Sequence, residues 1–114
     1  MPVHLVIGIK APAGEQAPSI QAVAAKLRHL TGCSPEEHLS LHRRPYLLFQ
    51  MPEQVHVKYN LLADKDGWNQ EWKYPEHRGY GVLIVVLETE RPDFFRSLAL
   101  NIGFKQAVLK EVSW

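Results

Sequence analysis

The pattern of hydrophobic positions predicts an alternation of strands and helices along the chain. Residues 3–10, VHLVIGIK, are rich in β-branched residues and run into a turn-forming Ala-Pro-Ala-Gly sequence, which predicts a first strand. Between Ile20 and Leu30, apolar residues recur at spacings of three and four, the period of one helix face. Ser19 is placed to cap this helix and Gly32 to end it.

The middle of the chain is expected to be mostly extended. Residues 34–37, Ser-Pro-Glu-Glu, have the capping-box spacing that predicts a short helical turn. From Leu39 to Leu62, extended segments are separated by two prolines, and apolar and polar residues alternate from residue 55 onward. Residues 63–79 then form a polar connection of about seventeen residues, a length at which loops are often functional.

The second half of the chain predicts a strand, a helix and a final strand. Residues 82–87, VLIVVL, are apolar at every position, which indicates a central strand covered on both faces. Pro92 begins the predicted helix, Gly103 ends it, and residues 105–114 return as a strand. The apolar stripe of this helix is Phe94, Phe95, Leu98, Ala99 and Ile102.

This order of elements predicts an α+β fold of the ferredoxin-like type. We expect a two-layer sandwich with a mainly antiparallel sheet of four to five strands and two main helices on one face. The strands that begin at Val3 and Val82 should lie side by side in the middle of the sheet. The length of 114 residues, with 46% hydrophobic and 22% charged positions, is typical of a single globular domain, residues 1–114.

Charge and cysteine content narrow the class of protein. The net charge is +1, from 13 basic and 12 acidic residues without long runs, so no strong field toward nucleic acid or an anionic membrane is expected. Cys33 is the only cysteine, which excludes an intrachain disulfide and favours a reducing compartment. The opening lacks the order of a signal peptide, and residues 82–87 are too few to span a bilayer. We therefore expect a cytoplasmic protein with no membrane partner.

Histidine is a candidate metal ligand or acid/base group. His38 and His42 are four residues apart, a spacing that would place both rings on one face of a helix, with Cys33 close by. A third ligand is missing except for His77, which is a candidate only by elimination, so we predict neither a metal nor a cofactor. The chain has six histidines: His4, His29, His38, His42, His56 and His77.

Two further histidine interpretations concern catalysis and RNA. His56 and Lys58 share the polar face of a predicted strand and could act as acid and base on RNA or an ester. No nucleophile elbow, phosphate-binding loop or dinucleotide fingerprint is present in the sequence. RNA-binding sheets stack bases on aromatic residues, whereas the polar side of the first strand offers His4, Val6 and Gly8, so nucleic acid is disfavoured as a partner.

Pro2 is a candidate catalytic residue. Removal of Met1 would leave a secondary amine at the start of the first strand, able to act as a base or nucleophile. The strand led by Pro2, the helix that ends at Gly32 and the sequence SPEEHLSLHRRP resemble one β-α-β half of the tautomerase superfamily. That resemblance implies a catalytic N-terminal proline and an arginine that binds the substrate carboxylate, here Arg43 or Arg44. The second half of the chain departs from it, because the later helix is too short to repeat the first unit.

Residues 64–81, DKDGWNQEWKYPEHRGYG, are polar and turn-forming yet rich in aromatic residues. Either the tryptophans fold back over the core, or the segment is an interaction surface, because Trp, Tyr and Arg dominate binding hot spots. Without a coherent catalytic set, we expect a small protein-binding module of inhibitor or immunity type, with another protein as partner and self-association left open. A small enzyme is the alternative, and an RNA-binding domain is the second. The predicted binding residues are Trp68, Trp72, Tyr74, Arg78 and Tyr80.

Overall fold

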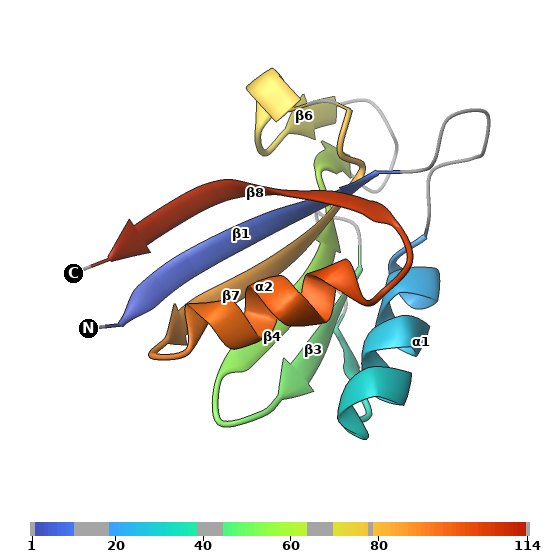
Figure 1. Ribbon diagram of the computed structural model, residues 1–114. Helices are drawn as coiled ribbons and strands as arrows, with labels where there is room; N and C mark the ends of the chain where they lie inside the picture. Colours follow the sequence, from blue (N-terminus) through green and yellow to red (C-terminus); the bar gives the residue numbers. More distant parts are fainter. Residues whose placement is uncertain (1, 11–18, 39–44, 64–69, 78, 114) are drawn as a thin grey trace.

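A computed structural model of the chain describes residues 2–10, 19–38, 45–63, 70–77 and 79–113, with the backbone alone for 61–63 and 70–72. Within these residues the chain forms two α-helices, a six-stranded antiparallel sheet and a separate two-stranded sheet (Figure 1). The elements are β1 Val3–Lys10, α1 Ile20–Thr31, β2 Glu36–His38, β3 Tyr46–Gln50, β4 Gln54–Tyr59, β5 Leu61–Ala63, β6 Gln70–Trp72, η1 Pro75–His77, β7 Val82–Thr89, α2 Pro92–Leu100 and β8 Lys105–Ser113. The α+β class is confirmed, but the main sheet has six strands rather than four to five.

The main sheet has the strand order β2-β3-β4-β7-β1-β8, and every neighbouring pair is antiparallel. The two most apolar strands, β1 and β7, are adjacent, with Ile7 opposite Ile84, as predicted. All residues of β7 from Val82 to Val86 are buried, as expected for a strand covered on both faces. β8 pairs with β1 from Lys10 back to Val3, so the two ends of the described chain lie side by side (Figure 1).

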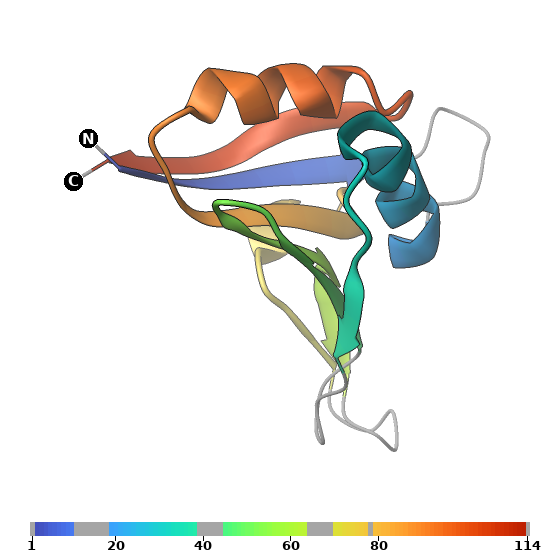
Figure 2. The same cartoon turned by 90° about the horizontal axis from the view of Figure 1, so that it is seen from below.

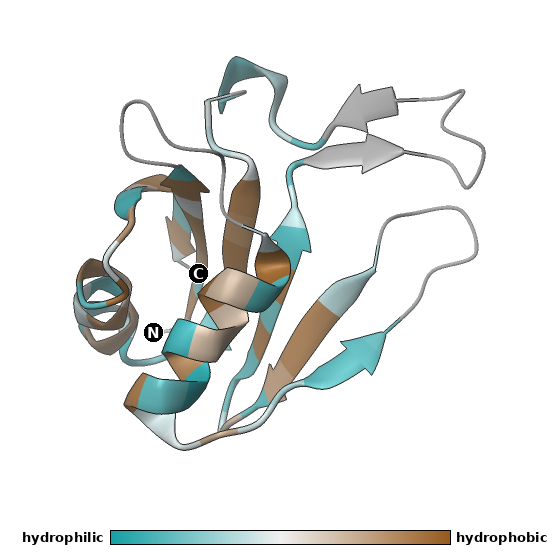
Figure 3. Cartoon of the chain, turned by 90° about the vertical axis from the view of Figure 1, so that its right-hand side faces the viewer, coloured by the Kyte–Doolittle hydropathy of each residue, from teal (hydrophilic) through white to brown (hydrophobic). Residues whose placement is uncertain are grey.

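Both helices cover the same face of the sheet, α1 over β3 and β4 and α2 over β1 and β8 (Figure 2). Hydrophobic residues are concentrated on the middle strands, while the edge strand β2 is hydrophilic (Figure 3). Alternate residues of each middle strand therefore join the helices in one core. Its members include Leu5, Ile7, Ile9, Val23, Leu27, Phe49, Val57, Ile84, Phe95 and Ile102.

Local signals place α1 where the sequence predicts it. The Ser19 hydroxyl accepts the N–H of Ala22 at 3.1 Å, and Gly32 adopts a φ of 74° while donating its N–H to the carbonyl of Arg28. Two residues of the predicted apolar faces do not belong to the core: Leu30 of α1 is 42% exposed and Phe94 of α2 is 40% exposed. No helix in the described part of the chain is long and apolar enough to cross a membrane.

Two expectations for the middle of the chain are wrong. The capping-box sequence does not form a helical turn: Glu36–His38 is the edge strand β2, which pairs with β3. The polar connection predicted at residues 63–79 is not a loop throughout, since it contains β6, paired with β5, and the 3-10 helix η1. We refer to residues 61–81, between β4 and β7, as the arm. The hairpin β5-β6 of the arm follows the end of β4, at the end of the main sheet where β7 begins (Figure 1).

Candidate functional site

Asn60, which follows β4, fastens the arm to the sheet. It is fully buried. Its side-chain amide donates to the carbonyl oxygens of His77 at 3.0 Å and Tyr80 at 2.9 Å, and its Oδ1 accepts the N–H of Tyr74 at 2.9 Å. Its backbone carbonyl also accepts the N–H of Lys73 at 2.8 Å. One side chain therefore fixes the backbone of the arm at several points.

The arm also packs on the sheet face that the helices leave open. Tyr74 lies against a small buried cluster on this face, and burial, helped by the negative charge of Glu76, raises the pKa of its hydroxyl. Tyr80 lies directly over Gly8, where an added Cβ would be 2.8 Å from the Tyr80 Cβ. The ammonium of Lys10 is 5.7 Å from the centre of the Tyr80 ring. The cluster beneath Tyr74 consists of Val6, Leu83 and Val85.

The structure brings together two of the five predicted binding residues. Tyr74 and Tyr80 are half-buried and share Asn60 as a hydrogen-bond partner. Trp72 ends β6, where its backbone pairs with Leu61. Trp68 and Arg78 lie outside the described residues. The two tyrosines thus have a packing role, and the binding role of the set stays a prediction.

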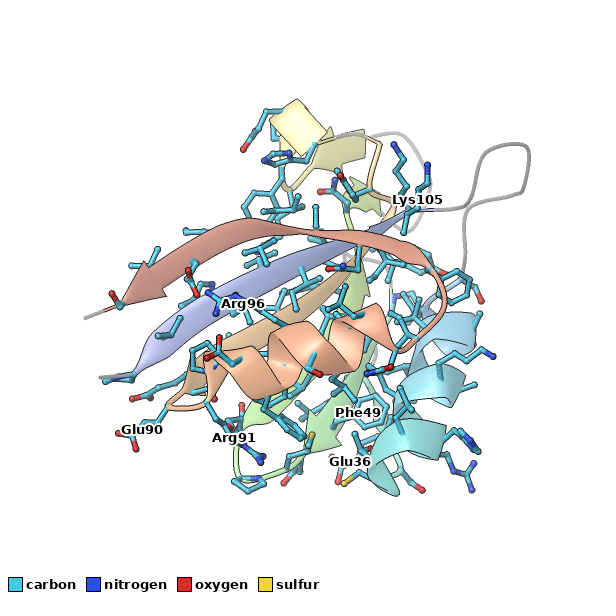
Figure 4. The ribbon with its side chains drawn as sticks, viewed as in Figure 1. Glu36, Phe49, Glu90, Arg91, Arg96 and Lys105 are labelled. Atoms are coloured by element: carbon cyan, nitrogen blue, oxygen red, sulfur yellow. The ribbon has the colours of Figure 1, made fainter. Side chains whose placement is uncertain are left out.

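A hollow of about 450 Å³ opens beside the start of β1, at the turn between β7 and α2. Glu53 lies buried at its wall and accepts two hydrogen bonds from Arg91, both at 2.9 Å, and one from Thr89 at 2.6 Å. Figure 4 shows Glu90 and Arg91 at this turn, below the start of α2. The hollow is lined by Pro2, Pro52, Glu53, Glu88, Thr89, Glu90 and Arg91.

Pro2 shares this hollow with one arginine, Arg91. The guanidinium of Arg91 is bound on two nitrogens by Glu53, so it is not free to bind a substrate carboxylate. Arg43 and Arg44 lie outside the described residues. Catalysis by Pro2 stays a prediction.

Glu53 should make the stability of the protein depend on acid pH. Hydrogen bonds from Arg91 outweigh the effect of burial and hold the pKa of Glu53 below its ordinary value of 4.5. A carboxyl group with a lowered pKa stabilises the folded state above its unfolded pKa, and this contribution is lost as the pH falls through the folded pKa. We expect Glu53→Gln to lower the free energy of unfolding at neutral pH by about 1–2 kcal/mol.

Urea unfolding at a series of pH values tests this prediction. The difference between parent and Glu53→Gln should be largest near neutral pH and shrink between about pH 5 and about pH 2. Asp93→Asn is the matched control, because Asp93 pairs with Arg96 but its side chain is 95% exposed. A difference for Glu53→Gln that is independent of pH would contradict the assignment.

Three aromatic rings form a stack across β2, β3 and β4 on the open face of the sheet. The rings of His38 and Tyr46 have centroids 5.2 Å apart and planes 10° apart, and those of Tyr46 and His56 are 5.2 Å and 9° apart. Burial lowers the pKa of His56, with smaller contributions from the charges of Lys58, His38 and Lys73. His56 and Lys58 are recognisable in the sequence as polar residues of one strand face, but the sequence carries no signal for the stack, because the stack depends on strand pairing.

His38 and His42 do not form the helical pair considered as metal ligands. His38 lies in a strand, His42 is outside the described residues, and Cys33 is a free thiol packed against the core. Across the residues that the structure describes, no group of three or more His, Cys, Asp or Glu side chains could hold a metal ion.

Neither a family model nor a curated protein nor a solved structure matches this chain.

Proposed function

We propose that this chain is a protein-binding module that recognises its partner through the arm. The observation that carries the proposal is the attachment of the arm by Asn60, whose buried side chain bonds the backbone at Tyr74, His77 and Tyr80. A segment fixed in this way loses little conformational freedom when it binds, so more of its contact energy is available for affinity.

The hairpin of the arm is the proposed contact region. β5 and β6 form their own two-stranded sheet, which is separate from the main sheet. An isolated two-stranded hairpin is only marginally stable in water, so the hydrogen bonds of Asn60 to the arm are what would stabilise this one. Trp72 ends β6 and Trp68 precedes it, and tryptophan is the residue type most enriched among binding hot spots. An inhibitor or immunity-type protein of the cytoplasm, which blocks another protein, fits a small scaffold with one such arm.

Capture of the partner from the host, followed by affinity measurements, tests the proposal. We expect Trp72→Ala or Trp68→Ala to weaken partner binding about thirtyfold while changing the free energy of unfolding by less than about 1 kcal/mol. Phe94→Ala is the matched control, since Phe94 is an exposed aromatic residue on α2.

Two results would contradict the arm as the recognition element. If both tryptophan variants lose several kcal/mol of stability, in the range of about 3–5 kcal/mol typical of a buried Trp, the side chains cover the core instead. If both fold normally and bind the partner as the parent does, another surface is responsible. Self-association as the sole interaction would identify a second copy as the partner.

We also propose that the arm is an insertion in a ferredoxin-like core. The order β4-β7-β1-β8 supports this, because β7 connects through α2 to β8, two positions away, and β1 leads through α1, β2 and β3 to β4, also two positions away. This is the split β-α-β arrangement of that plan. β2 and β3 would then be an extension of the sheet beyond β4.

A further inference from the structure

β4 presents a short basic row on the open face of the sheet. Val55 and Val57 belong to the core beneath the helices, so His56 and Lys58, which alternate with them, lie on the opposite face. Both side chains are half-buried. Burial lowers the pKa of each, and the charge of Lys73 lowers both further.

The backbone of Lys73 lies at the end of this row, because the arm folds back onto the end of β4. Its backbone N–H donates to the carbonyl of Asn60 at 2.8 Å, and Asn60 lies two residues beyond Lys58. The side chain of Lys73 is exposed. Among the residues that the structure describes, neither lysine forms an ion pair. His56 and Lys58 therefore share one face of β4, the backbone of Lys73 is held at the end of that strand, and no described carboxylate pairs with either lysine.

The imidazole of this row is held in place by the ring stack. His56 stacks on Tyr46, Tyr46 stacks on His38, and His38 Nε2 lies 3.4 Å from a carboxylate oxygen of Glu36. The same oxygen of Glu36 accepts a hydrogen bond from Gln50 at 3.1 Å, so this carboxylate is already engaged. The Nε2 atom of His56 is buried and has no hydrogen-bond partner among the described residues.

We propose that His56, Lys58 and Lys73 form a binding site for a small phosphate-bearing anion, either inorganic phosphate or a phosphate monoester. Like charges held together repel one another, and an anion between them replaces that repulsion with attraction. A phosphate monoester carries about 1.5 to 2 negative charges at neutral pH and offers three acceptor oxygens, which suits two ammonium groups and an imidazole whose protonated form the bound anion would favour. A single carboxylate would neutralise only one of the two lysines.

The same geometry argues against nucleic acid as the ligand of this face. Proteins that bind single strands expose aromatic ring faces on which bases stack. Here the faces of Tyr46 are covered by His38 on one side and His56 on the other. Two lysines also provide few of the phosphate contacts on which nucleic-acid affinity depends.

The test measures binding of inorganic phosphate and phenyl phosphate to the full chain at constant ionic strength, with chloride as the comparison. NMR of the imidazole signals should show the pKa of His56 rising as phosphate is added, because the anion stabilises the imidazolium. Lys58→Met and Lys73→Met should each raise the dissociation constant about tenfold or more. Lys26→Met, on an exposed position of α1, is the matched control and should change it less than about twofold.

Several outcomes would overturn the proposal. Phosphate that binds no more tightly than chloride, or a Lys26→Met variant weakened as much as Lys58→Met, would remove the site. An oligonucleotide that binds far more tightly than either probe and is lost in the same variants would replace the small anion as ligand. If Lys58→Met fails to fold, Lys73→Met decides, because that side chain is exposed. No protein partner is present in this experiment, so a negative result would contradict the anion site without bearing on the proposal that the arm recognises a protein.

Discussion

Asn60→Ala is expected to lower the free energy of unfolding by about 3 kcal/mol. Truncation removes the hydrogen bonds that the Asn60 side chain makes to the arm and leaves the carbonyls of His77 and Tyr80 and the N–H of Tyr74 without this partner. A buried polar group that loses its partner costs far more than an average hydrogen bond contributes, because its desolvation is no longer compensated. The loss should also detach the arm from the open face of the sheet.

Urea unfolding gives the size of this effect, and amide hydrogen exchange gives its location. The amide protons of Lys73 and Tyr74, which bond to Asn60 in the parent, should exchange faster in the variant than those of β1 and β7. Asn101→Ala is the matched control, since that amide also donates to a carbonyl, of Ser97 at 2.8 Å, but on an exposed surface. A loss below about 1 kcal/mol for Asn60→Ala, no larger than for the control, would show that water replaces the missing amide.

The sequence was a good guide wherever the structure is decided locally. The cap at Ser19 and the left-handed stop at Gly32 involve partners within four residues, so their chemistry is visible in the sequence. β1 was predicted with its observed bounds because β-branched residues and a following turn are both local signals.

The sequence was a poor guide wherever distant pairing decides the structure. Residues 34–37 carry a helix-start signal, yet Glu36–His38 pairs with β3, and the tertiary contact overrides the local preference. The count of six strands was missed for the same reason, since β2 is three residues long and has no hydrophobic pattern of its own. The ring stack is invisible in the sequence because it joins three strands.

Asn60 shows the same limit within the candidate site. The sequence pattern predicts Asn60 as a polar residue on the solvent-facing side of an alternating strand, whereas its side chain is fully buried. Its partners are 14 to 20 residues away, so no local pattern identifies them. The aromatic content of the arm was visible, but the division of the tyrosines between packing and recognition depends on how the arm folds back.

Gly8→Ala is expected to destabilise the protein by about 2 kcal/mol, although alanine suits a strand better than glycine. The added Cβ would lie 2.7 Å from a methyl group of Leu109 and 2.8 Å from the Cβ and Cγ atoms of Tyr80. Leu109 can rotate away, but the Tyr80 Cβ is bound to a backbone that Asn60 holds, so the arm itself must shift. Gly79→Ala, within the arm, is the matched control, because its added Cβ would meet nothing within 4 Å.

A double-mutant cycle decides whether this cost arises at Tyr80. In a Tyr80→Gly background, which lacks both the Cβ and the ring that lie over Gly8, Gly8→Ala should cost at least about 1 kcal/mol less than in the parent. Equal costs in the two backgrounds would mean that the strain lies elsewhere, at Leu109 or within β1. A reduced cost, together with weaker partner binding in Gly8→Ala than in Gly79→Ala, would show that Gly8 is the position that lets the arm dock closely on the sheet. The absence of a side chain at Gly8 would then determine how closely the arm packs on the sheet, and so where the arm is positioned to bind its partner.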